Sequence, residues 1–162
     1  MEIAQTIPRE VGLEAELLAA HPLLVKRLTV VLRDEHEAQD VAQAAYARAL
    51  ERRSSFRGGD ARAWLFTIGL RLAFNELRRR RRLTALPDEG GPTWAMSSEP
   101  DLWAALGELD PQQRAAMVLS VLDGYTHAEI AEMLGVRPGT VSSWISRSRD
   151  RLRAALEGPA HD

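Results

Sequence analysis

Residues Ala61 to Arg82, ARAWLFTIGLRLAFNELRRRRR, constrain the fold of this chain more than any other stretch. The segment has no Pro and one Gly. Wound at about 100° per residue, it places apolar side chains around more than half of its circumference. A helix with so wide an apolar face is buried by several neighbours. The sequence therefore predicts a central helix over 61–82 within a helical bundle.

One narrow stripe of this helix is polar and runs into five consecutive arginines. The stripe and the residues after it are Trp64, Thr67, Arg71, Asn75, Arg78, Arg79, Arg80, Arg81 and Arg82. Aromatic rings stack on bases, Asn and Thr reach base edges, and Arg pairs with phosphate, which is the chemistry for contacting a nucleic-acid strand. An ordinary solvated face gives the same pattern, and cations are favoured at helix C-termini in any case. The stripe alone does not separate these interpretations.

The formal net charge of −2 conceals two basic blocks in an acidic chain. Residues 52–82 hold ten bases and two acids, and residues 137–153 hold five bases and one acid. Residues 83–136, between them, hold nine acids and one base. Nucleic acid would meet the basic blocks, whereas the acidic surface would be left for protein partners.

Several classes of protein are excluded by what the chain lacks. There is no Cys, so disulfides and thiolate metal sites are excluded and a reducing cytoplasm is expected. No stretch approaches the roughly 20 apolar residues of a membrane span, which predicts a soluble protein without membrane insertion. The four histidines lack metal-ligand spacing, and no catalytic triad or phosphate loop occurs. We therefore expect no metal, no cofactor and no enzymatic activity.

The first part of the chain is predicted to be a helical domain over residues 1–82, preceded by a frayed start. A helical pattern from Gly12 to Leu32 contains Pro22, which should break it or open a new helix. A second helix is expected over Glu35–Arg53. Asp34 would cap that helix, with Glu37 as the acid of a capping box.

A loop over Ser54–Asp60 then leads into the central helix, with Asp60 as its N-cap. Residues 83–100 follow, with three Pro, two Gly, three acids and no bases, and predict a flexible acidic linker. Trp94 within it could dock the linker, although a lone Trp more often packs on its own domain.

The second part, residues 101–157, predicts a helix-turn-helix domain. Two helices come first, one ending near Leu109 and one started by Asp110-Pro111. Thr126 and Glu129 then form a capping box for a short helix that ends at Gly135. A turn over 137–139 is expected to follow, with Thr140 capping the last helix. Two helices joined by a tight turn that contains Gly are the signature of this motif.

The last helix has the pattern of a recognition helix. Its expected buried face is Val141, Ile145, Ser148, Leu152 and Leu156. Its candidate DNA contacts are Arg137, Thr140, Ser142, Ser143, Ser146 and Arg147. Small hydroxyls and Arg near the N-terminal end suit the major groove. An α-hairpin at a protein interface is the alternative.

The parts in this order resemble the extracytoplasmic-function (ECF) group of RNA polymerase sigma factors, over roughly Glu14 to Leu156. HEAQDVAQAAYARAL (36–50) is similar to the family's acidic helix, with Asp40 and Gln43 at matching places. Residues 61–82 resemble its promoter-melting helix, and residues 109–156 resemble its C-terminal domain. The fold implied is all-α, with two small helical domains joined by the linker.

The resemblance also implies partners and roles. Asp40 and Gln43 would bind the β′ clamp helices of core RNA polymerase, and the second domain would sit on the β flap. The central stripe, from Trp64 to Arg80, would bind the −10 element, with the Ser54–Asp60 loop holding a flipped base. Asp88 and Glu89 would approach the polymerase active centre. The last helix would read the −35 element, and an anti-sigma factor would be a further partner.

The chain departs from the family's usual residues at some positions, which are Ala44, Arg71, Asn75, Ser142 and Trp144. These departures bear on promoter sequence rather than on class. The competing class is a stand-alone helix-turn-helix regulator, which the second half fits equally well. The first half has no ligand-pocket or phospho-acceptor signature and carries a basic block of its own, which favours the sigma interpretation.

Overall fold

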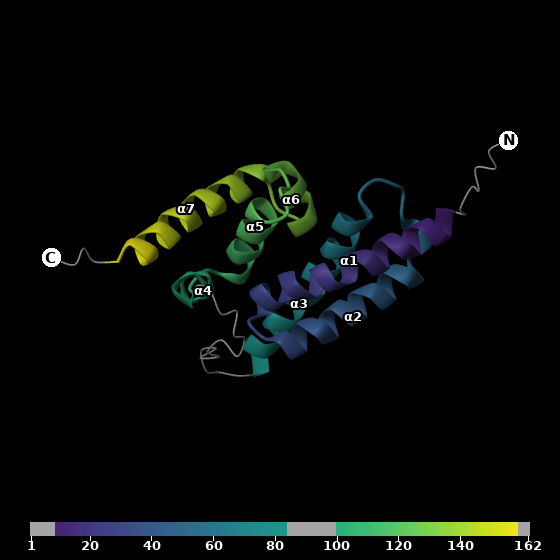
Figure 1. Ribbon diagram of the computed structural model, residues 1–162, viewed down its shortest axis with the longest axis horizontal. Helices are drawn as coiled ribbons and strands as arrows, with labels where there is room; N and C mark the ends of the chain where they lie inside the picture. Colours follow the sequence, from purple (N-terminus) through teal and green to yellow (C-terminus); the bar gives the residue numbers. More distant parts are fainter. Residues whose placement is uncertain (1–8, 84–99, 159–162) are drawn as a thin grey trace.

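The structure, a computed structural model, describes residues 9–83 and 100–158, and within these ranges every regular element is helical (Figure 1). The elements are α1 (Arg9–Leu32), α2 (Glu35–Glu51), a 3-10 turn (Arg53–Ser55), α3 (Ala61–Leu83), α4 (Pro100–Gly107), α5 (Pro111–Val121), α6 (His127–Leu134) and α7 (Pro138–Glu157). The all-α prediction is confirmed. Residues 1–8 and most of the predicted linker, with Asp88, Glu89 and Trp94, lie outside the described residues.

Helices α1, α2 and α3 pack against one another to form the first half of the molecule (Figure 1). Four alanines of α2 are fully buried on one face, Ala38, Ala42, Ala45 and Ala49, while Val41, Tyr46 and Leu50 pack at the edges of the same core. On α3, Gly69 allows the helix to lie close to α1, because a Cβ at this position would lie 2.9 Å from a methyl carbon of Leu24. Close approach of the three helices therefore depends on alanines and one glycine.

The predicted break at Pro22 is wrong, because α1 runs through it without interruption. Pro22 is exposed, whereas Leu17 and Leu24 on either side of it are fully buried. The carbonyl that the proline ring leaves without its intrahelical partner belongs to the exposed Leu18, where water can reach it. Burial of the apolar stripe holds the helix together at this point.

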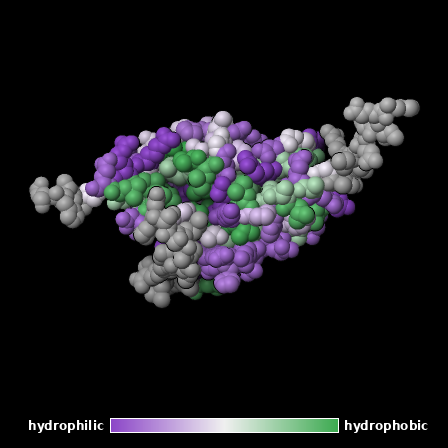
Figure 2. All heavy atoms as spheres, viewed as in Figure 1, coloured by the Kyte–Doolittle hydropathy of each residue, from purple (hydrophilic) through white to green (hydrophobic). Residues whose placement is uncertain are grey.

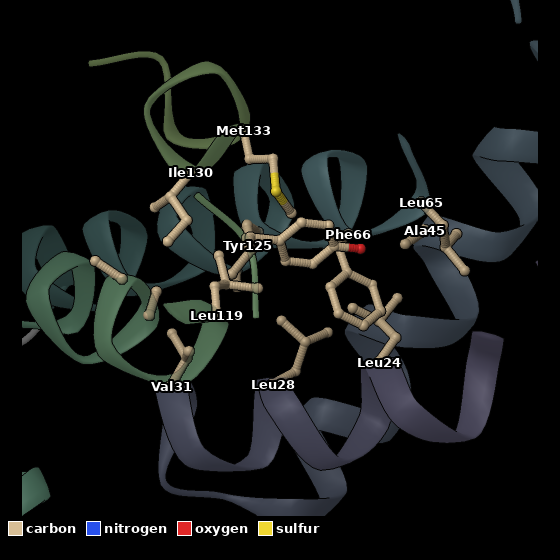
Figure 3. Packing of buried hydrophobic residues seen from close by; sticks show 14 of the residues in the cluster. Leu24, Leu28, Val31, Ala45, Leu65, Phe66, Leu119, Tyr125, Ile130 and Met133 are labelled. Carbon is tan, nitrogen blue, oxygen red and sulfur yellow. The ribbon is translucent and has the colours of Figure 1, made fainter. Parts of the chain in front are cut away.

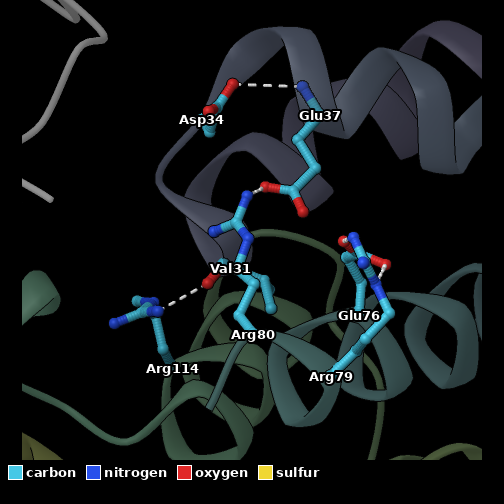
Figure 4. Close-up of polar contacts among 7 residues, drawn as sticks. All are labelled: Val31, Asp34, Glu37, Glu76, Arg79, Arg80 and Arg114. Carbon is cyan, nitrogen blue, oxygen red and sulfur yellow. Dashed lines mark hydrogen bonds and ion pairs between the residues drawn. The ribbon is translucent and has the colours of Figure 1, made fainter. Parts of the chain in front are cut away.

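The predicted helix caps are largely confirmed. Asp34 accepts a hydrogen bond from the Glu37 backbone N–H at 3.1 Å, and Asp60 accepts one from Ala63 at 3.0 Å. The capping box of Thr126 and Glu129 is formed in both directions. The reciprocal half of the box at Asp34 is absent from the hydrogen bonds described, since the Glu37 carboxylate instead pairs with Arg80 of α3 (Figure 4).

Two expectations for the last helix are wrong. Helix α7 begins at Pro138 with Arg137 as its N-cap residue, so Thr140 lies inside the helix and does not cap it. The fixed φ of proline suits the first helical position, which moves the start forward. Leu156 is 51% exposed rather than buried. Figure 1 shows the reason, since the last turn of α7 projects beyond α4.

The two halves pack together along a contact surface that we call the seam, formed by α1 and α3 on one side and α5 and α6 on the other. Figure 3 shows Leu24, Leu28 and Phe66 of the first half close to Leu119 and Tyr125 of the second. These side chains belong to one continuous buried cluster. The apolar core therefore crosses from one half to the other.

Three arginines make short polar contacts across the seam, and Arg33 adds a longer one to the carbonyl of Gly107 at 3.5 Å. Arg27 pairs with both carboxylate oxygens of Asp123, at 2.9 and 2.8 Å. The guanidinium of Arg114, a buried residue, donates to the backbone carbonyl of Val31 (Figure 4). It also donates to the carbonyls of Leu106, Gly107 and Leu109. The third, Arg62, donates to the hydroxyl of Tyr125 at 3.0 Å.

Candidate nucleic-acid and polymerase interfaces

The polar stripe of α3 lies opposite the seam. Phe66 and Leu70 are buried, and at about 100° per residue Arg71 and Asn75 point away from them. Arg71 and Asn75 are exposed. Trp64 is half-buried, with its ring 5.2 Å from that of Phe56. Packing of the two halves therefore leaves the stripe uncovered.

The stripe residue Thr67 makes a hydrogen bond to the backbone of its own helix. Thr67 is half-buried, and its hydroxyl donates to the carbonyl of Ala63 at 2.8 Å. Its proton is therefore used locally, and an outside base would meet only the oxygen lone pair. The aromatic and amide members of the stripe remain better placed for base contact.

The arginine run at the end of α3 is partly neutralised by carboxylates. Arg79 pairs with Glu76 at 2.6 Å, and Arg80 pairs with Glu37 of α2 (Figure 4). The hydrogen bond from Arg79 lowers the pKa of Glu76, and the same bond raises the pKa of Arg79. Arg81 and Arg82 are exposed. The run therefore offers less free positive charge than its five arginines suggest.

Arg78 has a different local role. Its guanidinium donates to the side-chain oxygen of Asn75. A guanidinium has only donors, so the amide oxygen of Asn75 must face it and the NH₂ group must face outward. Sequence spacing could have suggested this contact and that of Arg79 with Glu76, since both join residues three apart on a helix. The pairing of Arg80 with Glu37 required the packing of α2 on α3.

The loop before α3 is held from both halves. Gly58 and Gly59 have φ of 93° and 88°, values that favour glycine. One oxygen of Asp60 caps α3, and the other accepts from the Tyr125 hydroxyl at 3.1 Å. Burial raises the pKa of Tyr125, and the hydrogen bond to Tyr125 raises that of Arg62. Sequence reasoning missed Arg62 and Tyr125 because nothing in the sequence joins residues 63 positions apart.

The candidate polymerase contacts are both on the outer side of α2. Asp40 and Gln43 are exposed, opposite the buried alanine face. Figure 2 shows hydrophilic residues along this helix. The two side chains lie one turn apart and can contact the same partner surface.

The second half gathers its candidate DNA contacts on the exposed face of α7. Arg137, Ser142, Ser143, Ser146 and Arg147 are exposed, and Thr140 is half-buried. The Nε of Arg147 donates to the Ser143 carbonyl at 3.3 Å. On the other side, Val141, Ile145, Ser148 and Leu152 are buried, so the helix is firmly seated. Trp144 is half-buried.

Two further features, a metal-binding group and a membrane-spanning helix, are absent from the described residues. No group of His, Cys, Asp or Glu side chains in the described ranges could hold a metal ion. Among the helices described, none is long and apolar enough to cross a membrane. The surfaces that remain as candidate sites are the stripe of α3, the outer side of α2 and the exposed face of α7.

Comparison with known proteins identifies the family. The models for Sigma-70 region 2 and for Sigma-70, region 4 match residues 17–83 and 100–152. The chain is 35% identical to the ECF RNA polymerase sigma factor SigE of Mycolicibacterium smegmatis, over 87% of this chain and 60% of that protein. It is 31% identical to the ECF RNA polymerase sigma factor EcfG of Rhodopseudomonas palustris, over 93% of this chain and 88% of that protein. The chain belongs to the ECF RNA polymerase sigma factors.

Solved structures agree with this assignment. The sigma factor RpoE of Bartonella quintana, in its co-crystal structure with the anti-sigma factor NepR, matches with a TM-score of 0.76 and 27% identity. The match covers 90% of this chain and 97% of that chain. The resemblance found in the sequence is thereby confirmed, and the stand-alone regulator is not favoured. Sigma factors are transcription initiation factors. The chain spans less than two thirds of the length of SigE.

Proposed function

We propose that this chain binds core RNA polymerase, directs it to promoters with −10 and −35 elements, and helps to melt the −10 region. The observation that carries the proposal is the pair of exposed polar surfaces, on α3 and α7, one in each segment matched by a sigma family model. The protein would act in the cytoplasm and would contribute binding energy rather than catalytic residues. The predicted domains over 1–82 and 101–157, with the 83–100 linker, are part of this proposal.

Each surface has a proposed role. In the first half, Trp64, Thr67, Arg71 and Asn75 would contact the −10 strand, while Arg78, Arg79 and Arg80 would add affinity for phosphate. In the second half the −35 contacts would be Arg137, Thr140, Ser142, Ser143, Ser146 and Arg147. Asp40 and Gln43 would bind the β′ clamp helices, and the second half would contact the β flap.

An anti-sigma factor is a further proposed partner. The support is that the matched RpoE structure holds the anti-sigma factor NepR and that its fold covers 90% of this chain. Such a protein would hold this chain away from polymerase until it is released.

Transcription from a library of randomised promoters, by core RNA polymerase with and without the protein, tests the proposal. Initiation that requires the protein at a shared two-element sequence is the expected result. No such requirement, together with specific duplex binding by the protein alone, would favour a stand-alone regulator instead.

Variants assign the roles within the same assay. Asn75→Ala should re-rank promoters, because a base contact depends on sequence, and equal loss at every promoter would contradict that role. Asp40→Ala should weaken binding to core polymerase without changing promoter ranking. Glu51→Ala removes an exposed acid at the far end of the same helix and is the matched control.

A further inference from the structure

A contact between the two helices of the helix-turn-helix motif involves a residue that the sequence did not single out. Nδ1 of His127 lies 2.8 Å from Oγ of Ser142. His127 is the first residue of α6, and Ser142 lies in the second turn of α7. Both residues are exposed. A candidate −35 contact is therefore held by a side chain from the other helix.

The proton of the Ser142 hydroxyl has a partner within the protein in either tautomer of His127. Oγ of Ser142 lies 3.2 Å from the carbonyl oxygen of Pro138, which only accepts, and next to Nδ1 of His127. If Nδ1 carries a proton, Oγ accepts from it and donates to Pro138; if Nδ1 carries none, the hydroxyl donates to Nδ1. In both cases Ser142 keeps an unused lone pair but no unused donor.

Both partners of this contact are fixed in place. Thr126 and Glu129 close the capping box around the first turn of α6, with hydrogen bonds of 3.2 and 2.7 Å. Beneath α6 the buried Ile130 anchors the helix, and the buried Val141 anchors the start of α7. The imidazole thus approaches Ser142 from a rigid first turn, which limits how far the hydroxyl can turn.

We propose that His127 is a positioning residue that sets the base preference of Ser142 in duplex recognition, an inference that rests on the proposed function. Because its proton is used within the protein, by Pro138 or by His127, Ser142 can only accept a hydrogen bond from a base. In the major groove the donors are the amino groups of adenine and cytosine, whereas guanine and thymine present acceptors. Ser142 therefore favours adenine or cytosine at one position of the −35 element.

The neighbouring residues sharpen this preference. Ser143 and Ser146 lie on the same exposed face of α7 without a comparable imidazole partner among the contacts described, and their hydroxyls can turn to donate or accept. Ser142 alone is fixed as an acceptor. The exposed face of α7 thus combines one serine that can only accept a hydrogen bond with two serines that can donate or accept one.

The test is promoter selection by the holoenzyme formed from the full chain and core polymerase, with all −35 positions randomised. The wild-type protein should prefer adenine or cytosine at one position by about fivefold, the scale of one good base hydrogen bond. His127→Ala should remove that preference at the same position as Ser142→Ala, and the double variant should add nothing further. His127→Asn should restore it, because its amide can donate from near the Nδ1 position.

The control and the contrary outcomes are specific. His36→Ala, an exposed histidine of α2, should leave the −35 preference unchanged. If His127→Ala leaves every preference unchanged, or lowers all promoters equally, His127 does not position Ser142. If the wild-type protein supports no initiation at all, the proposed function fails instead, so the two failures are distinguishable.

Discussion

Arginines in two regions of this molecule have opposite surroundings. At the seam, Arg114 is 4% exposed and its guanidinium donates to four backbone carbonyls, while Arg27 binds an Asp123 side chain that is 2% exposed. At the end of α3, by contrast, Arg81 and Arg82 are exposed and the Arg79 side chain is 59% exposed. Burial therefore decides which arginines hold the fold together and which can bind a partner.

Replacing Arg114 should have the largest effect on stability. Arg114→Met keeps the apolar length of the side chain but leaves buried carbonyls of both halves without a donor. We expect a loss of about 3 kcal/mol in the free energy of unfolding, measured by urea denaturation. Arg153→Met, an exposed position on α7, is the control and should change it by less than about 0.5 kcal/mol. An unchanged value for Arg114→Met would mean that the hydrogen bonds of Arg114 do not stabilise the seam.

The ion pair across the seam should come next. A double-mutant cycle with Asp123→Asn and Arg27→Gln should give a coupling energy of about 2 kcal/mol, because the pair is charged, bidentate and largely buried. The matched exposed pair, Arg53 and Glu14 at 3.9 Å, should give a coupling near zero. Equal coupling in the two cycles would contradict the role of burial.

The Tyr125 hydroxyl should contribute a smaller, pH-dependent amount. Tyr125→Phe removes its hydrogen bonds with Asp60 and Arg62 and should cost about 1 kcal/mol near neutral pH. Burial raises the pKa of Tyr125 above its usual value of 10.0, so this stability is present below pH 10 and is lost as pH rises through the folded-state pKa.

Unfolding measured from pH 8 to pH 11 would check this dependence. The variant Tyr125→Phe should lose part of the decline in stability that the wild-type protein shows at alkaline pH. Tyr46→Phe serves as the control for general effects of tyrosine ionisation. If the stability of Tyr125→Phe declined as much as that of the wild-type protein, ionisation of Tyr125 would not contribute to the decline at alkaline pH.

The two exposed arginines Arg81 and Arg82 should affect stability least and DNA binding most. Replacing Arg81 and Arg82 by Gln should reduce the salt dependence of holoenzyme binding to promoter DNA, with the slope of log K against log salt falling by about 1.5. The midpoint of unfolding should not move. Replacing Arg79 and Arg80 removes the same charge but also frees two carboxylates, so it should lower that midpoint as well. If the two double variants had the same unfolding midpoint and the same salt dependence, the ion pairs of Arg79 and Arg80 would have no effect on stability.

Much of the local structure could be predicted from the sequence because its causes are local. Helical periodicity gave the elements, and short-range hydrogen bonds at Asp34, Asp60 and Thr126 fixed helix starts. The polar stripe of α3 and the exposed face of α7 followed from the same periodicity. The errors at Pro22 and Thr140 arose where burial, or the preference of proline for the first helical position, outweighed a local rule.

The sequence by itself therefore determined the helices, their apolar faces and the residue types available to each candidate interface, since these depend on neighbours within about four positions. Only the tertiary structure decided which polar side chains are paired, because Arg80 contacts Glu37, Arg27 contacts Asp123 and His127 contacts Ser142 between segments that are far apart in the sequence. Such pairs depend on the angles and distances at which helices pack, and those are set by the fit of buried side chains over the whole core.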